Sequence, residues 1–277
     1  MIHRKIYRQF FIAIILLPVS VAFAQNLVLP NAYAHNDYWH KRPLLDALDN
    51  GFTYVEADVF LRHDKLIVAH FLPCLQKKRT LEDLYLKPLL NYVAGNSKNE
   101  SFNNSGLTLM IDIKSDADKT YKELVLLLEK YSAILSSFKD GRLTIRNVTV
   151  IITGHKPANL ISDADKRLAF MDEDLKRAGS DSSTNVYPMA SCKYSSLLKW
   201  KGKGTISASD IQRLNYYVAE AHKKGRKVRL WGSPEKKMVW AELLKCNVDL
   251  INTNKLKALR NYLVSDLLLV AKKSQLL

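Results

Sequence analysis

Eight short apolar runs rich in strand-forming residues recur between residues 32 and 253, and helix-like stretches separate most of them. This alternation favours a parallel sheet covered by helices, and eight repeats over roughly 250 residues are typical of a single (β/α)8 barrel of the TIM type. The alternative is an open doubly wound sheet, but no Gly-x-Gly-x-x-Gly turn follows the first run. The predicted strands are Ala32–His35, Tyr54–Phe60, Leu107–Lys114, Val148–Thr153, Leu168–Met171, Val186–Ala190, Val228–Trp231 and Leu250–Thr253.

The stretches between these runs carry helix start and stop signals. Gly51 follows one stretch as an expected C-cap, Thr80 offers an N-cap, and Pro234 suits a first helical turn. A further apolar segment, Lys65–His70, is predicted to return as a hairpin beside the second strand. We expect helices over Pro43–Asn50, Thr80–Val93, Ala117–Phe138, Ser207–Lys224, Pro234–Lys245 and Leu256–Lys272.

The first 24 residues have the pattern of a secretory signal peptide. Arg4, Lys5 and Arg8 precede an apolar run, and Ala22 and Ala24 form a small-residue cleavage site. An uncleaved membrane anchor is the alternative, although the apolar run is short against the about 20 residues that span a bilayer. We therefore expect a signal peptide over residues 1–24, one barrel domain over residues 25–277, and a secreted or periplasmic protein.

The chain is strongly basic. Lys+Arg 42 against Asp+Glu 27 give a net charge of +15, and removing three cations with the first 24 residues would leave 39 − 27 = +12. Such an excess predicts anionic partners. No zinc-finger, recognition-helix or RNA-binding pattern occurs in the sequence, so nucleic acid is not expected. An anionic membrane surface and a phosphorylated small molecule both remain compatible with the charge.

Carboxylates stand where a buried strand should be apolar. Glu56 and Asp58 are two residues apart on one predicted strand and so share a face, and Asp112 and Lys114 repeat this spacing on the next strand. Buried like charges are costly unless a cation neutralises them. Three carboxylates supply hard oxygen ligands, which suit Mg²⁺ or Ca²⁺. The alternative is structural salt bridging, for instance between Lys114 and Glu56.

Two histidines end strands beside these carboxylates. His35 closes the first predicted strand and His70 closes the hairpin return. A single histidine at such a place is most often structural. Two of them next to carboxylate-bearing strands favour acid–base chemistry. In a barrel of this type, the carboxyl ends of the strands form the active site.

Several blocks between residues 35 and 254 follow one known pattern. They are His35-Asn36-Asp37-Tyr38, Pro43-Leu44-Leu45-Asp46-Ala47-Leu48, Val55-Glu56-Ala57-Asp58-Val59, Leu66-Ile67-Val68-Ala69-His70, Ile111-Asp112-Ile113-Lys114, Val228-Arg229-Leu230-Trp231 and Val248-Asp249-Leu250-Ile251-Asn252-Thr253. This pattern resembles the phosphatidylinositol phospholipase C-like phosphodiesterases, which include the glycerophosphodiester phosphodiesterases. Within that superfamily the chain is most similar to the altered inheritance of mitochondria protein 6 group.

The resemblance implies a TIM-type barrel and metal-dependent cleavage of a phosphodiester. By position it implies that Glu56, Asp58 and Asp112 hold the divalent ion, and that His35 and His70 act as general base and acid. It also implies that three further residues meet the substrate. Lys114 and Asn36 would contact phosphate oxygens, and Trp231 would form a wall of the pocket, with core packing as the alternative for Trp231.

The chain also departs from the superfamily pattern. Phe71 stands where Asp often follows the second histidine, and Asn254 stands where the last strand often ends in Asp. Asn36 occupies the position of the Arg that glycerophosphodiesterases usually carry. These differences leave the proposed ligands and histidines in place but weaken any transfer of glycerophosphodiester specificity.

Together these features predict a metal-dependent phosphoric diester hydrolase with a phospholipid-derived or glycerophosphodiester-like substrate. We expect an anionic phosphodiester substrate, contact with an anionic membrane surface, and a monomer. The alternative is a non-catalytic protein that binds an anionic ligand or lipid on the same barrel.

Overall fold

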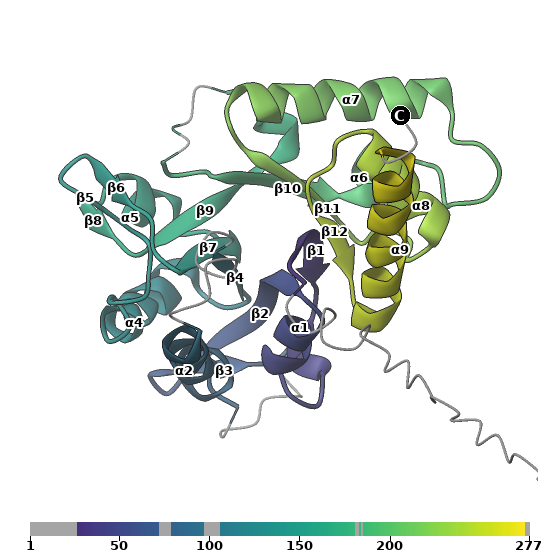
Figure 1. Ribbon diagram of the computed structural model, residues 1–277. Helices are drawn as coiled ribbons and strands as arrows, with labels where there is room; N and C mark the ends of the chain where they lie inside the picture. Colours follow the sequence, from purple (N-terminus) through teal and green to yellow (C-terminus); the bar gives the residue numbers. More distant parts are fainter. Residues whose placement is uncertain (1–26, 72–78, 97–105, 181–182, 184, 275–277) are drawn as a thin grey trace, which may run out of the picture.

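The computed structural model describes residues 27–71, 79–96, 106–180, 183 and 185–274, and its centre is a barrel of parallel strands (Figure 1). The strands follow one another around the barrel in the order β11-β10-β9-β7-β4-β2-β1-β12. Among the described residues, Arg229 of β11 forms one parallel bridge with Leu250, the residue directly before β12, so the barrel is nearly closed. The barrel strands are β1 (Leu29–Ala34), β2 (Phe52–Arg62), β4 (Leu107–Ile113), β7 (Val148–Gly154), β9 (Ala169–Asp174), β10 (Met189–Lys193), β11 (Lys227–Trp231) and β12 (Ile251–Thr253).

Helices lie around the outside of these strands (Figure 1). The Ser207 side chain caps α7 by accepting the N–H of Asp210, as its place before the helical pattern predicts. Another strand, β3 (Lys65–Val68), runs antiparallel to β2, which confirms the predicted hairpin return. The helices are α1 (Leu45–Asp49), α2 (Lys87–Gly95) after a π-helical turn (Glu82–Leu86), α4 (Ala117–Glu129), α5 (Ala158–Ser162), α6 (Tyr194–Leu197), α7 (Ala208–Lys223), α8 (Lys237–Lys245) and α9 (Leu256–Ser274).

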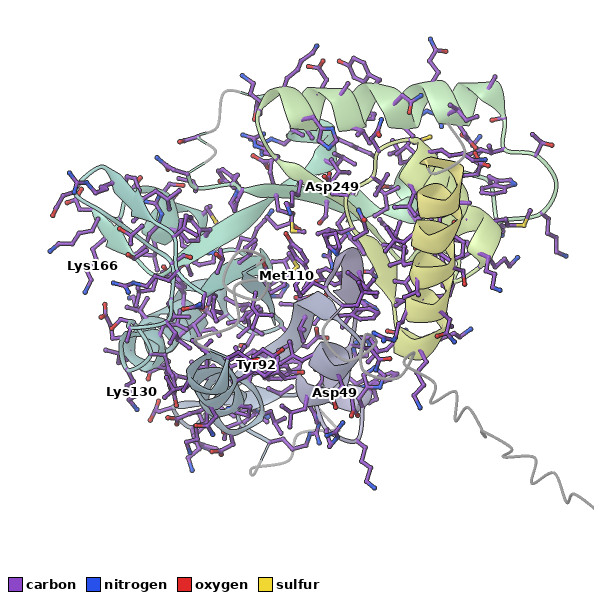
Figure 2. All side chains as sticks on the ribbon, in the orientation of Figure 1. Asp49, Tyr92, Met110, Lys130, Lys166 and Asp249 are labelled. Atoms are coloured by element: carbon purple, nitrogen blue, oxygen red, sulfur yellow. The ribbon has the colours of Figure 1, made fainter. Side chains whose placement is uncertain are left out.

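Alternate residues of the strands pack into two different layers, as the two-residue period of a strand requires. One set fills the barrel interior, and the other packs against the helices together with residues such as Leu124 and Leu214. Met110 lies at the centre of the molecule, whereas Lys130 and Lys166 lie at its periphery (Figure 2). The interior set is Tyr33, Met110, Ile151, Phe170, Met189 and Leu250.

Most predicted elements differ from the observed ones by a few residues at an end, and two of the differences have a clear physical reason. The helix expected over Ala117–Phe138 ends at Glu129, and a three-stranded sheet of β5 (Ser137–Lys139), β6 (Arg142–Thr144) and β8 (Lys166–Arg167) follows it. The Arg167 guanidinium carbon lies 4.0 Å from the centroid of the Phe138 ring, so the apolar side chain of Phe138 packs within this sheet. The strand expected over Val186–Ala190 begins only at Met189, directly after Pro188, which has no N–H to donate to a strand ladder.

No helix within the described ranges is both long and apolar enough to cross a membrane. The predicted signal peptide, residues 1–24, lies outside the residues that the structure describes.

Candidate active site

A cavity of about 760 Å³ opens at the carboxyl ends of the barrel strands. This is the end at which TIM barrels carry their active sites. Every side chain that the sequence analysis singled out lines this one cavity. They are His35, Asn36, Glu56, Asp58, His70, Asp112, Lys114 and Trp231.

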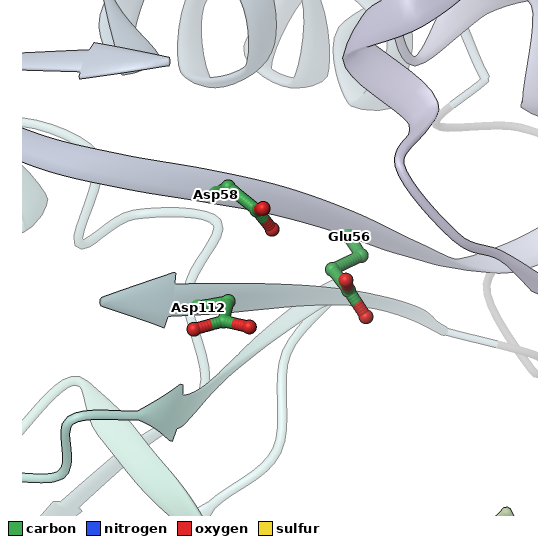
Figure 3. A group of neighbouring side chains, drawn as sticks. All are labelled: Glu56, Asp58 and Asp112. Atoms are coloured by element: carbon green, nitrogen blue, oxygen red, sulfur yellow. The ribbon is translucent and has the colours of Figure 1, made fainter. Parts of the chain in front are cut away.

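Three carboxylates converge in the cavity (Figure 3). Glu56 and Asp58 lie on β2, and Asp112 is the direct neighbour of Asp58 on β4. One carboxylate oxygen of each of the three lies within 4.8 Å of the others. Burial, reinforced by the charges of Glu56 and Asp112, raises the pKa of Asp58 to about 6. A cation bound between the three carboxylates would relieve both the burial of their charges and the repulsion between them.

The donor set of this cluster fits a divalent cation. Asp58 Oδ1 and Asp112 Oδ1 are buried and have no hydrogen-bond partner among the described residues. Buried carboxylate oxygens without partners are costly, and a hard cation bound by oxygen would satisfy them. Gly154 belongs to the same arrangement, because a Cβ at this position would collide with the Asp112 carboxylate. Its positive φ of 71° also favours glycine.

Two buried side chains inside the barrel hold the Glu56 carboxylate by hydrogen bonds. The Arg229 guanidinium donates to Glu56 Oε2 at 2.7 Å, and the Tyr33 hydroxyl donates to the same oxygen at 2.5 Å. Burial alone would raise the pKa of Glu56, but the charges of Arg229 and His35 and the two hydrogen bonds together outweigh burial and lower that pKa. Because both bonds go to Oε2, Oε1 stays available to the cavity, 3.5 Å from His35 Nε2.

Sequence reasoning missed the part that Arg229 plays. Arg229 is 3% exposed and lies inside the barrel, 4.4 Å above the Tyr33 ring and 4.0 Å from Asp172. The available signal was a charged residue in the middle of the apolar strand Val228-Arg229-Leu230-Trp231, which is the same signal that singled out Glu56.

Lys114 does not pair with Glu56, as the salt-bridge alternative suggested, but with Asp112 at 2.6 Å and Asp58 at 3.3 Å.

His70 lies against the carboxylate cluster through one ring nitrogen. Its Nδ1 is 3.0 Å from Asp58 Oδ2, and the Tyr38 hydroxyl lies 2.8 Å from the same oxygen. A proton on Nδ1 that is donated to Asp58 fixes the ring orientation and leaves Nε2 for proton transfer. The exposed rings of Trp39 and Phe71 flank His70, with ring centroids at 5.6 and 5.8 Å.

His35 is oriented by residues from both ends of the chain. Its Nδ1 lies 2.9 Å from Asn254 Oδ1 and 3.0 Å from Asn36 Nδ2. Asn36 Oδ1 in turn lies 2.7 Å from the Tyr38 hydroxyl, so the Asn36 amide is largely occupied by contacts within the protein. Asn254, which the sequence showed only as a departure from the family pattern, is thus a positioning residue for His35.

The remaining predicted side chain, Trp231, is 39% exposed and ends β11 at the cavity wall. Its ring faces a cation, since Lys193 Nζ lies 5.7 Å from the ring centroid. Such a placement favours the pocket wall over simple core packing.

Fold and site together define a phosphodiesterase-type barrel, and comparison with known proteins agrees. Residues 21–172, more than half of the chain, match the AIM6-like phosphodiesterase domain. The chain therefore belongs to the AIM6-like phosphodiesterase family, which confirms the resemblance inferred from the sequence.

Two curated relatives and one solved structure extend this result. An altered inheritance of mitochondria protein 6 homolog of Arthroderma benhamiae is 29% identical over 83% of this chain and 82% of that protein. Altered inheritance of mitochondria protein 6 of Eremothecium gossypii is 32% identical over 85% of this chain and 70% of that protein. A glycerophosphodiester phosphodiesterase from Parabacteroides distasonis has the same fold, with a TM-score of 0.52 and 16% identity over 85% of this chain and 97% of that one. The predicted TIM-type barrel is confirmed.

The expected location of the protein was wrong. The relatives are named for an altered inheritance of mitochondria, which points to a mitochondrial role and away from a secreted or periplasmic protein. A basic, acid-free N-terminus is common to secretory signals and to organelle-targeting segments. The pattern of residues 1–24 therefore could not separate the two.

Proposed function

We propose that the protein is a divalent-cation-dependent phosphodiesterase with a phospholipid-derived or glycerophosphodiester-like substrate. The observation that carries the proposal is the meeting of three carboxylates, two of which have a buried oxygen without a partner, with two oriented histidines in one cavity. Two such oxygens side by side in one cluster favour an ion site over a network of salt bridges alone, because buried polar groups without partners are rare in folded proteins.

Glu56, Asp58 and Asp112 are the residues that would hold the ion, and their oxygen donors suit Mg²⁺ or Ca²⁺. When bound, such an ion offsets negative charge on the phosphoryl oxygens. Arg229 and Tyr33 keep the Glu56 carboxylate ionised and fixed through Oε2. Lys114 draws Asp58 and Asp112 together, and its ammonium group, which has three donors, can also contact a phosphate oxygen.

His35 and His70 are proposed to carry the protons. One imidazole removes the proton of the attacking hydroxyl, and the other protonates the leaving oxygen as its bond to phosphorus breaks. His70 is held for this task by Asp58, and His35 by Asn254. Glu56 Oε1, 3.5 Å from His35 Nε2, stabilises the imidazolium that forms when His35 accepts a proton.

Two further predicted contacts belong to the proposal. Asn36 lies at the cavity, and its amide Nδ2, which contacts His35 Nδ1 and more distantly Asn254 Oδ1, would give up the longer contact to donate to a phosphate oxygen. Trp231 offers an exposed ring as one wall of the substrate site.

We also propose that the cavity mouth contacts an anionic membrane surface. Trp39 and Phe71 are 64% and 49% exposed beside His70, and the chain carries +15. Exposed aromatic rings enter the lipid interface while cations attract anionic headgroups. In sedimentation with vesicles of anionic phospholipid, Trp39→Ala should lower the bound fraction, whereas Tyr216→Ala on α7 should not. Equal binding of Trp39→Ala and wild type would contradict this contact.

Activity on a panel of soluble glycerophosphodiesters and lysophospholipids tests the main proposal. We expect hydrolysis that stops with a chelator and returns when Mg²⁺, Ca²⁺ or Mn²⁺ is added. Ion binding without turnover on any member of the panel would favour the non-catalytic alternative.

A matched pair of variants tests the ion site directly. Glu56→Gln keeps the size of the side chain but removes one ligand charge, so we expect at least about tenfold weaker ion binding by calorimetry. The thermal stabilisation by the ion should fall with it, because a ligand that binds the folded state stabilises that state. Glu242→Gln, which removes only a surface pair with Lys245, is the control. Equal ion affinity in Glu56→Gln and wild type would rule out this site.

A further inference from the structure

Three lysines line the cavity on the side away from the histidines. Lys156 follows β7, and Lys193 ends β10. Lys176 lies in the 3₁₀ turn Leu175–Arg177, which follows β9. Around the barrel, these strands come after β1, β2 and β4, which carry the histidine and carboxylate groups. The cavity therefore has the carboxylate cluster at β2 and β4, and at β7, β9 and β10 a second side where the three lysines stand near Asp172, Glu173 and Asp174.

The three lysines differ from the other cations of the cavity in having no carboxylate partner. Lys114 is paired with Asp112 and Asp58, and Arg229 with Glu56. Within the part of the chain that the structure describes, no carboxylate lies within salt-bridge distance of the three ammonium groups. Lys156 Nζ donates to the backbone oxygen of Asp172 at 2.6 Å, which leaves two of its three N–H groups for a ligand.

The acids on the same side of the cavity are engaged in the scaffold. Asp172 accepts hydrogen bonds from the hydroxyls of Ser191 and Thr153 and lies near Arg229. Asp174 accepts the backbone N–H of Lys176 and so caps the turn, and Glu173 accepts the N–H of Asp174. With these carboxylates bonded elsewhere, the nearest partners of the lysines are uncharged, namely the Asp172 backbone oxygen for Lys156 and the Trp231 ring for Lys193.

Unpaired cations in a concave site attract an anionic ligand, because the low-dielectric walls focus their field. An ammonium group binds phosphate as a point charge. A volume of about 760 Å³ also lies in the range of pockets that enclose a whole small molecule. A diester phosphate alone would occupy the acidic side and leave the lysines without a ligand.

We propose that Lys156, Lys176 and Lys193 form a subsite for a second anionic group of the substrate. This inference rests on the proposed phosphodiesterase function, since the diester group itself is placed at the carboxylate cluster. The substrate class is then a phosphodiester that also carries a phosphomonoester, either as a soluble molecule or as the headgroup of a lipid.

Matched substrates test this subsite. The soluble pair is glycerophosphoglycerol with and without a phosphate on its terminal hydroxyl, and the lipid pair is phosphatidylglycerol and phosphatidylglycerol phosphate in vesicles. We expect kcat/KM to be at least about tenfold higher for the phosphorylated member of one pair. A tenfold difference corresponds to about 1.4 kcal/mol of free energy. The pair that shows the preference identifies the soluble or the lipid source. Equal kcat/KM within both pairs would overturn the proposal.

Two triple variants separate the subsite from a general charge effect. The variant with Lys156→Met, Lys176→Met and Lys193→Met should lose the preference to within about threefold while it still cleaves the unphosphorylated member. The control changes Lys199, Lys201 and Lys203 to Met, which removes the same charge from exposed positions outside the cavity. An unchanged preference in the cavity variant, or an equal loss in the control, would contradict the subsite.

A binding measurement keeps this test independent of turnover. If wild type cleaves neither pair, the proposed function fails, and calorimetric titration with glycerol 1,3-bisphosphate and glycerol 1-phosphate decides the subsite. Binding of the bisphosphate at least about tenfold tighter than the monophosphate, lost in the cavity variant alone, would support the subsite. Equal affinity for the two probes in wild type would overturn it.

Discussion

The two halves of the barrel contribute different things to the cavity. Between residues 35 and 114, β1 to β4 supply both histidines and all three carboxylates of the cluster. The half from β7 to β12 supplies lysines, the exposed Trp231, and two side chains that reach across to hold groups of the first half. Arg229 holds Glu56, and Asn254 holds His35. The residues proposed to carry the chemistry thus lie close together in sequence, whereas the side chains that position two of them come from the distant half of the chain.

The largest effect is expected where the first half is broken. His35→Ala and His70→Ala should each lower turnover by about 10²- to 10⁴-fold, because each removes a proton-transfer group. The melting temperature should change little, since both side chains lie at the cavity and not in the core. The double variant should lose less than the product of the single losses, because the two groups act as a unit.

His40→Ala and His222→Ala serve as controls for this pair, since neither residue lines the cavity. Full activity in His35→Ala or in His70→Ala would remove that residue from the mechanism. If both variants stayed fully active, the proposed site would have to be abandoned.

The link between the halves is tested at Arg229. Arg229→Met leaves the Glu56 charge buried without its partner, which should destabilise the fold by about 3–5 kcal/mol. Adding Glu56→Gln removes that charge, so the double variant should regain part of the loss in denaturant unfolding. Arg229→Lys keeps a charge but loses the planar fork, and should weaken ion binding in a folded protein. Additive losses in the double variant would mean that the pair does not couple the halves.

A smaller effect should separate structural from chemical carboxylates within the first half. Asp37 is buried, accepts the N–H of Leu44 and the hydroxyl of Tyr85, and does not line the cavity. Burial raises its pKa from 3.8 to about 6. The folded protein therefore binds this proton more tightly than the unfolded chain, and stability is lost as pH rises from about 4 through about 6.

Asp37→Asn removes this titration. Relative to the variant, the free energy of unfolding of the wild type should fall by at most about 3 kcal/mol between pH 4 and pH 7. Denaturant unfolding at several pH values measures the difference. If the free energies of unfolding of the two proteins changed with pH in parallel, folding would not raise the pKa of Asp37.

The barrel and its acidic cluster could be predicted because both depend on local patterns. Alternation along β2 placed Glu56 and Asp58 on one face, and the strand order of a barrel brought Asp112 beside them. Partners far apart in sequence could not be predicted in this way. No period relates Arg229 to Glu56 or Asn254 to His35, because these pairs arise only when the barrel closes.

The small sheet of β5, β6 and β8 was missed for a related reason. The apolar spacing of α4 continues past Glu129 to Phe138, so the sequence pattern alone does not show where the helix ends. Phe138 instead packs against Arg167, a residue of a different strand, and this contact favours the sheet over a longer helix. Contacts of this kind are tertiary and override the local preference.

The bridge that closes the barrel has a consequence for motion in the molecule. Arg229 forms the bridge to Leu250 with its backbone and bonds Glu56 with its side chain. A ladder with one bridge opens more readily than the longer ladders beside it, so amide hydrogen exchange should be fastest along this junction among the barrel strands. Each opening would carry the Arg229 guanidinium with it and leave Glu56 Oε2 with the Tyr33 hydroxyl as its remaining donor. Motion at the barrel junction and the geometry of the Glu56 carboxylate are therefore coupled through Arg229.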